Sequence, residues 1–204
     1  MYPIAIVLVI GLAVVLERWL YLSHAKVTNK SAFNRLLPML QKNDYKAVVN
    51  MGQSSKAPIA RIVSAGVANI LMTKNRDHAE MAMEEGVMEA VPKLEKRTAY
   101  LATLANIATL LGLLGTIIGL IAAFTAVANA DPTEKATLLS QSISVAMNTT
   151  AFGLIAAIPL LLFHAMLQAK TTEIIDSLEM AGVKVLNIIG MKSTLKTTST
   201  PPSA

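Results

Sequence analysis

The sequence predicts an all-α integral membrane protein with three transmembrane helices and long helices that extend into a cytoplasmic helical domain. Two stretches, residues 99–130 and 136–169, contain no Asp, Glu, Lys or Arg. Each exceeds the roughly 20 apolar residues that an α-helix needs to cross a bilayer. Because only residues 131–135 separate them, we expect a transmembrane hairpin with helices at residues 99–130 and 138–169 and a turn at residues 131–137.

The composition supports a membrane protein and excludes several other classes. Hydrophobic residues make up 53% of the chain and charged residues only 15%, whereas about a quarter of a soluble domain is charged. The chain has no cysteine, so disulfides and thiolate metal sites are excluded. The net charge of +5 does not predict nucleic-acid binding, because the basic residues are dispersed among acidic ones. We expect no enzyme, cofactor or metal, since neither a triad nor a metal-ligand spacing is formed by His24, His78 and His164.

A third apolar run, residues 4–16, predicts a transmembrane helix near the N-terminus. The run is short for a span, but it lengthens to residues 1–22 if the Trp19 ring marks the interface and Arg18 extends its charge to the headgroups. The alternative is a cleaved signal peptide with small residues at positions 23–25. We favour the retained span, because no positive segment precedes the run and Glu17 and Arg18 interrupt its end.

The distribution of Lys and Arg predicts the orientation. Of the 18 basic residues, all but Lys135 lie at residues 18–97 or from Lys170 onward. The positive-inside rule therefore places the N-terminus and the turn at residues 131–137 outside the cytoplasm. Residues 23–98 and the C-terminus are expected in the cytoplasm.

The cytoplasmic region at residues 23–98 is predicted to be helical. Pro58 suits the first turn of a helix whose apolar residues recur at helical spacing, namely Ile59, Ile62, Val63, Val67, Ile70 and Leu71. Asp77 is the expected N-cap of a second helix, with an apolar face formed by Met81, Met88, Val91 and Leu94. Because only Pro92 interrupts the sequence up to the second span, we expect one bent helix at residues 77–128, about 75 Å long at 1.5 Å per residue.

The third span is predicted to continue as a cytoplasmic helix at residues 170–192. Spacings of three and four predict a helix-packing seam, formed by Ile175, Leu178, Gly182, Val185 and Ile189. The alternative is a solvated helix without a packing partner. The Thr-, Ser-, Pro- and Lys-rich residues 193–204 predict a disordered tail.

Glycines in the second span predict close helix packing. Gly112, Gly115 and Gly119 lie three and four residues apart, and such small residues let another helix approach. Packing within the chain and oligomerisation explain this pattern equally well. Thr109 and Thr116 share the glycine face, although a threonine in lipid can also satisfy itself by bonding a carbonyl of its own helix.

The outer half of the third span is polar over much of its circumference. Asn148 is costly in hydrocarbon unless it finds a partner, and it belongs to a polar set of Ser140, Gln141, Ser142, Ser144, Asn148, Thr149 and Thr150. Residues 151–162 carry no polar side chain. This pattern favours a hydrated cavity or ion path, with hydrogen bonding between helices as the alternative.

Two blocks resemble the MotA/TolQ/ExbB proton-channel family, and in particular its ExbB/TolQ branch. They are residues 111–119, LGLLGTIIG, and residues 149–159, TTAFGLIAAIP. The resemblance implies a homo-oligomer, commonly a pentamer, around single-span partners of the ExbD, TolR or MotB type. Thr116 and Thr150 occupy the family's threonines and Pro159 its helix-bending proline, while Gly153 belongs to the same packing set as Gly112.

One position departs from the family pattern. Members of the ExbB/TolQ branch usually carry a glutamate five residues before the third-span threonine, where this chain has Val145. Without an acid in either hairpin span, the partner helix must supply one, most simply an aspartate. Thr116, Thr150, Asn148, Thr149 and Ser144 would then line a path for H⁺ or Na⁺.

The sequence therefore predicts an ion-channel or stator subunit that converts ion motive force into work on the cell envelope, such as TonB-type transport with a TonB-like protein. The alternative is a non-conducting scaffold that docks a partner helix.

Overall fold

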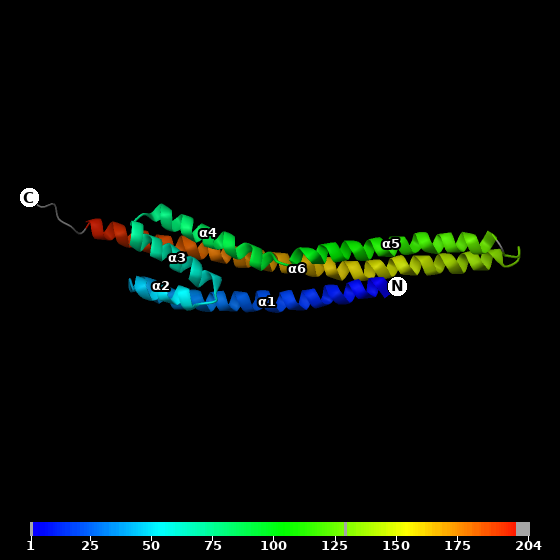
Figure 1. Ribbon diagram of the computed structural model, residues 1–204, viewed down its shortest axis with the longest axis horizontal. Helices are drawn as coiled ribbons and strands as arrows, with labels where there is room; N and C mark the ends of the chain where they lie inside the picture. Colours follow the sequence, from blue (N-terminus) through cyan, green and yellow to red (C-terminus); the bar gives the residue numbers. More distant parts are fainter. Residues whose placement is uncertain (1, 129, 199–204) are drawn as a thin grey trace, which may run out of the picture. The chain divides into compact units, whose positions relative to one another are not determined.

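The computed structural model describes residues 2–128 and 130–198, and the described part is built from helices without strands (Figure 1). In chain order the elements are α1 (Tyr2–Gln41), α2 (Tyr45–Ser54), α3 (Pro58–Thr73), α4 (Arg76–Glu95), α5 (Thr98–Ala128) and α6 (Lys135–Thr198). Among the described residues, three helical stretches are long and apolar enough to cross a membrane: Tyr2–Gln41, Arg76–Ala128 and Lys135–Gly190. The prediction of an all-helical chain with three candidate membrane spans is confirmed.

The chain divides into two compact units, which we describe separately. The first contains the chain up to Trp19 together with Arg97–Gln168, and the second contains Leu20–Lys96 together with the chain from Ala169 onward. The first unit therefore holds most of the apolar sequence, and the second holds most of the charged sequence.

In the first unit, α5 and the N-terminal half of α6 pack side by side as a hairpin (Figure 1). The buried residues of α5 are mostly small, and up to Gly112 they follow spacings of three and four: Thr98, Leu101, Ala105, Ala108, Gly112 and Ala123. Large apolar side chains such as Ile121, Phe124 and Ile155 are exposed instead. This distribution suits a hairpin whose outer surface meets lipid or other transmembrane helices.

In the second unit, α2, α3 and α4 form a helical cluster around larger apolar side chains. Ile62, Val63 and Val67 of α3 are buried, as the helical spacing predicts, and Pro58 begins the helix. Met83 of α4 lies against Gly66 of α3, and Ile62 lies against Gly86. The predicted seam in α6 is also present, since Leu178, Gly182 and Val185 are buried. Its first member is Ile174 rather than Ile175.

The single helix expected at residues 77–128 is wrong. The chain leaves the helical conformation at Lys96 and Arg97, and Arg97 has a left-handed φ of 68°. A left-handed residue stops the ladder of helical hydrogen bonds. Within the first unit, the Arg97 guanidinium also pairs with the Glu17 carboxylate of α1 at 2.6 Å.

The expected start and face of α4 also need correction. Asn75, not Asp77, is the N-cap, and its side-chain oxygen accepts from the Asp77 backbone N–H at 2.9 Å. The buried face consists of Ala79, Met83, Val87, Ala90 and Leu94. Of the predicted apolar face, Met81 and Met88 are exposed, because both lie on the opposite side of the helix from Met83.

The C-terminal tail is only partly as expected. The helix α6 continues to Thr198, so residues 193–198 are helical rather than disordered. Propagation of an existing helix costs little compared with nucleation, and the first proline that could end it is Pro201. Residues 199–204 lie outside the described part of the chain.

Candidate functional site

The two hairpin helices meet at their backbones around Gly112 and Gly153. A Cβ added to Gly153 would lie 2.8 Å from the Ala108 carbonyl oxygen and 2.9 Å from the Gly112 Cα. A Cβ added to Gly112 would lie 3.2 Å from the Gly153 Cα. No side chain fits between these backbones, so glycine is required on both helices. Gly153 and Gly112 therefore pack against each other.

Thr150 links the helices at the same point. Its hydroxyl Oγ1 donates to the Gly112 carbonyl oxygen at 2.9 Å, across 38 residues of sequence. The acceptor is accessible because Gly112 has no side chain to cover it. Thr150 is therefore the threonine of the third span that binds the neighbouring helix, and its hydroxyl oxygen retains lone pairs that can accept a hydrogen bond.

The other candidate threonines bond carbonyls of their own helices. Thr149 Oγ1 donates to the Val145 carbonyl at 3.0 Å, and Thr116 Oγ1 donates to the Leu113 carbonyl at 2.6 Å. Thr109 does the same with the Ala105 carbonyl at 3.2 Å. These bonds hold the donor protons, so Thr116 and Thr149 can offer only oxygen acceptors to an ion, water or carboxylic acid.

The remaining glycines of the second span also face α6 of the same chain. A Cβ on Gly115 would collide with the Thr149 side chain, and a Cβ on Gly119 would lie 2.5 Å from the Ala146 Cβ. The glycine face is thus occupied within the hairpin. Of the two explanations left open by the sequence, packing within the chain is the one that these contacts support, and a role of Gly115 and Gly119 in oligomerisation stays a prediction.

The polar N-terminal part of α6 lines a shallow, open hollow. It is formed by Ala136, Thr137, Ser140, Gln141, Ser144 and Val145. Asn148 lies one helical turn beyond Ser144 and is exposed. The Val145 side chain is 58% exposed, so the position at which the family carries an acid lies on an open face. This face offers neutral oxygen and nitrogen atoms, and a single chain does not enclose it.

Pro159 lies inside α6, and the helix continues on both sides of it. Proline has no backbone N–H, so the carbonyl four residues earlier loses its helical partner and the ring crowds it. The position therefore weakens the helix locally without ending it, at the half of the span where no polar side chain is available.

Sequence reasoning missed the ion pair between Glu17 and Arg97. Each of these charges lies at the end of an apolar run, where the sequence shows only a residue marking a membrane boundary. The sequence signal that could have indicated this pair is the opposite charge of Glu17 and Arg97, each at the boundary of an apolar run. Among the described residues, no group of three His, Asp or Glu side chains is placed to hold a metal ion.

Comparison with known proteins identifies the family. Residues 54–180 match the MotA/TolQ/ExbB proton channel family. The chain belongs to this family. The matched segment includes both the glycine block and the Thr150 block, and the chain is accordingly a membrane protein.

Three relatives support the ExbB/TolQ-like branch. A biopolymer transport protein of Synechocystis sp., ExbB-like 3, is 27% identical over 155 residues, which are 76% of this chain and 73% of the relative. An ExbB homolog of Methanothermobacter thermautotrophicus is 29% identical over 182 residues, 88% of this chain and 63% of the relative. The Tol-Pal system protein TolQ of Haemophilus influenzae is 35% identical over 95 residues, which are 46% of this chain and 40% of the relative. The chain therefore spans less than two thirds of the second and third relatives. The family and these relatives indicate a membrane energy-transducing subunit.

Proposed function

We propose that this chain is the channel-forming subunit of an ion-driven motor in the bacterial inner membrane. With single-span partners of the ExbD, TolR or MotB type, it would convert proton or sodium motive force into mechanical work on the envelope, such as TonB-type outer-membrane transport through a TonB-like protein. Its N-terminus would be periplasmic and its C-terminus cytoplasmic. The assembly would be a homo-oligomer, most simply a pentamer, around the partner helices.

The observation that carries this proposal is the position of Thr150. Its hydroxyl is fixed to the Gly112 carbonyl at 2.9 Å, on the same helix as an open hollow whose lining has polar but no charged side chains. A fixed, neutral oxygen can accept from a passing ion's water or from a protonated carboxyl group and then release it. Ser144, Asn148, Thr149 and Thr116 would supply further neutral groups on the path.

The acid must come from the partner, because residues 136–169 contain none. One charge that crosses a membrane at 100 mV releases roughly 2.3 kcal/mol. An aspartate of the partner helix would bind the ion on one side and release it on the other, and each event would change the charge that the surrounding subunits face. Rotation or rearrangement of the subunits around the partner would follow.

The scaffold alternative has one specific observation in its favour. The Thr150 hydroxyl and the glycine face both contribute to packing within the hairpin, and such a role needs no ion. In that case the open polar face of α6 would dock a partner helix without conducting.

Three threonine variants separate these functions. Thr150→Val removes the hydroxyl, Thr150→Ser keeps it, and Thr149→Val removes a hydroxyl whose bond stays within its own helix. We expect Thr150→Val to abolish ion flux through the assembled complex, Thr150→Ser to retain most of it, and Thr149→Val to reduce it partially. The measurement is ion flux in proteoliposomes with the partner, with oligomer recovery as the control. Normal flux with Thr150→Val in an intact complex would remove the Thr150 hydroxyl from the ion path, whereas the absence of ion flux through the assembled wild-type complex would establish the scaffold.

The orientation has its own test. Single cysteines at Ala57 and Thr133 should react with an impermeant thiol reagent from opposite sides of the membrane. Reaction of both from the same side would contradict the proposed topology.

A further inference from the structure

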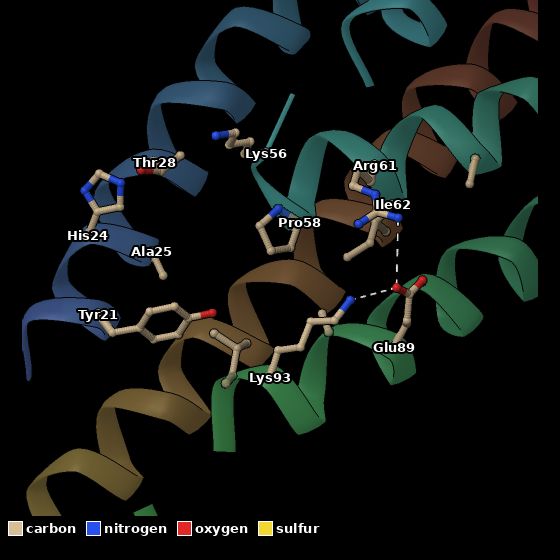
Figure 2. A pocket seen from close by; sticks show the side chains of 14 residues that line it. Tyr21, His24, Ala25, Thr28, Lys56, Pro58, Arg61, Ile62, Glu89 and Lys93 are labelled. Atoms are coloured by element: carbon tan, nitrogen blue, oxygen red, sulfur yellow. Dashed lines mark hydrogen bonds and ion pairs between the residues drawn. The ribbon is translucent and has the colours of Figure 1, made fainter. Parts of the chain in front are cut away.

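The second unit contains a cavity of about 430 Å³ between α1, α3 and α4. Its floor is apolar and includes the buried side chains of Ile62 and Leu94 and the small side chains of Ala65 and Ala90. Its rim carries polar and charged groups. Figure 2 shows Tyr21, His24 and Thr28 along one wall, Lys56 beside Thr28, and on the other side Arg61 and Lys93, each joined to Glu89 by a dashed line.

The rim has an excess of positive charge. Three cations, Lys56, Arg61 and Lys93, share it with one acid, Glu89. The Lys93 ammonium lies 2.8 Å from the Glu89 carboxylate, while the Arg61 guanidinium is 3.9 Å from the same oxygen. These cations hold the pKa of Glu89 below its usual value, chiefly through the Lys93 hydrogen bond, so the acid is ionised and cancels one charge.

Two cations therefore remain available. Among the described residues, the Arg61 guanidinium makes only the long contact to Glu89, so most of its donors are unused there. In the part of the chain that the structure describes, no side chain hydrogen-bonds or pairs with the Lys56 ammonium. A guanidinium offers several donors in one plane and suits a phosphate group, and a neighbouring ammonium adds a second positive charge.

The combination of an apolar floor and a cationic rim fits an amphiphile with a negative head. A free phosphate would use the rim and leave the floor empty. A phospholipid would place its phosphate at the rim and its glycerol and first acyl carbons against the floor. The place of the cavity along the sequence also fits a phospholipid. Tyr21 belongs to the end of the predicted first span, and His24, Ala25 and Thr28 follow within two helical turns. Basic pockets at such a boundary are typical sites for anionic lipid headgroups.

We propose that this cavity binds the headgroup of an anionic phospholipid, with the phosphate held by Lys56 and Arg61. The site uses residues outside the ion path and does not depend on the proposed function. Occupancy would stabilise the packing of α1 against α3 and α4, because a lipid bound there contacts all three helices.

The test is lipid binding to the purified full-length protein in a neutral detergent, measured by native mass spectrometry with phosphatidylglycerol and phosphatidylcholine. The double variant K56Q/R61Q should bind phosphatidylglycerol about 30-fold more weakly, or about fivefold for each charge removed, with no change for phosphatidylcholine. The matched control R35Q/K46Q removes the same charge from exposed positions outside the cavity and should bind like the wild type.

A second variant tests the floor without altering charge. Ala65→Phe should fill the cavity and lower phosphatidylglycerol binding by a similar factor, with circular dichroism as the check on folding. Wild-type binding by K56Q/R61Q would overturn the proposal. Displacement of the lipid by equimolar inorganic phosphate would also overturn it, and would show that the cavity takes a soluble phosphate. Since no ion gradient or partner is present, neither result bears on ion flux.

Discussion

The hairpin of α5 and α6 and the pair formed by α3 and α4 both depend on glycine, but in opposite ways. In the hairpin, Gly112 and Gly153 bring two backbones into contact. In the α3 and α4 pair, Gly66 makes room for the Met83 side chain and Gly86 makes room for Ile62. One region uses glycine to remove side chains from the interface, whereas the other uses it to admit large ones.

The solvent explains the difference. In lipid, burying a large apolar side chain between helices gains little, since the lipid tails are equally apolar, so close backbone packing and hydrogen bonds such as that of Thr150 must hold the helices together. In water, each buried apolar side chain stabilises the fold by about 1.5–3 kcal/mol. The same residue type therefore has different consequences when it is replaced in the two regions, which the following variants test.

The largest effect is expected from Gly153→Val. A side chain there must displace the Ala108 carbonyl and the Gly112 backbone, which cannot move as a flexible side chain can. Overpacking typically costs about 1–3 kcal/mol, and we expect Gly153→Val to lower the free energy of unfolding by about 3 kcal/mol or more. The hydrogen bond from Thr150 to the Gly112 carbonyl should be lost as well. Unfolding in a detergent titration measures this loss of stability. A near-normal transition would mean that the backbones are not in contact.

A slightly smaller effect is expected from Ile62→Ala in the second unit. Ile62 is 2% exposed, so truncation removes buried apolar surface and leaves a cavity. The cost should be about 2–4 kcal/mol, measured by thermal or denaturant unfolding. The exposed Leu71 of the same helix provides the control, because Leu71→Ala should change stability by less than about 0.5 kcal/mol.

Gly182→Ala should stabilise the chain modestly. A Cβ there would meet Met83 Sδ at 3.6 Å, an ordinary contact, and alanine is a better helix former than glycine by about 1 kcal/mol. Gly66→Ala is the contrasting variant, because its Cβ would lie 2.6 Å from Met83 Cγ, and the displaced methionine should offset the helix gain. Equal stabilisation by both variants would show that Met83 does not pack against Gly66.

The smallest effect concerns pH and Glu89. Lys93 and Arg61 lower the pKa of this carboxyl group in the folded chain, so its stabilising contribution is present above the unfolded-state pKa and is lost as the pH falls through the folded pKa. Glu89→Gln should therefore lower the melting temperature slightly at pH 7 and make no difference well below about pH 4. If the wild type still melted at a higher temperature than Glu89→Gln well below this pH, the difference would not come from ionised Glu89, and the prediction would be wrong.

Much of the membrane-embedded fold could be predicted from the sequence. The absence of charge over residues 99–130 and 136–169 is sufficient to predict two spans. Apolar segments of this length match the thickness of a bilayer, and a helix is the structure that pairs all their backbone polar groups there. Periodicity likewise predicted the start of α3 at Pro58 and the buried positions Leu178, Gly182 and Val185. These features depend on local composition and spacing, which the sequence contains in full.

The errors occurred where a distant residue decided the outcome. At the helix break, Arg97 adopts a left-handed conformation and pairs with Glu17, 80 residues away, and nothing near Arg97 in the sequence distinguishes it from a helical residue. The buried face of α4 is set by contacts of Met83 with α3, so two exposed methionines were assigned to it. Asn75 and Asp77 are both competent caps, and only the backbone geometry selects between them.

The candidate site shows the same division. The sequence by itself determined that the hairpin carries threonines, glycines and no acid, because residue types and their spacing are local properties. Only the tertiary structure decided that Thr150, rather than Thr116 or Thr149, donates to the opposite helix, and that the glycine face is filled within the chain. A hydroxyl can bond its own helix or its neighbour at similar energy, so the choice depends on how closely Gly112 allows the second backbone to approach.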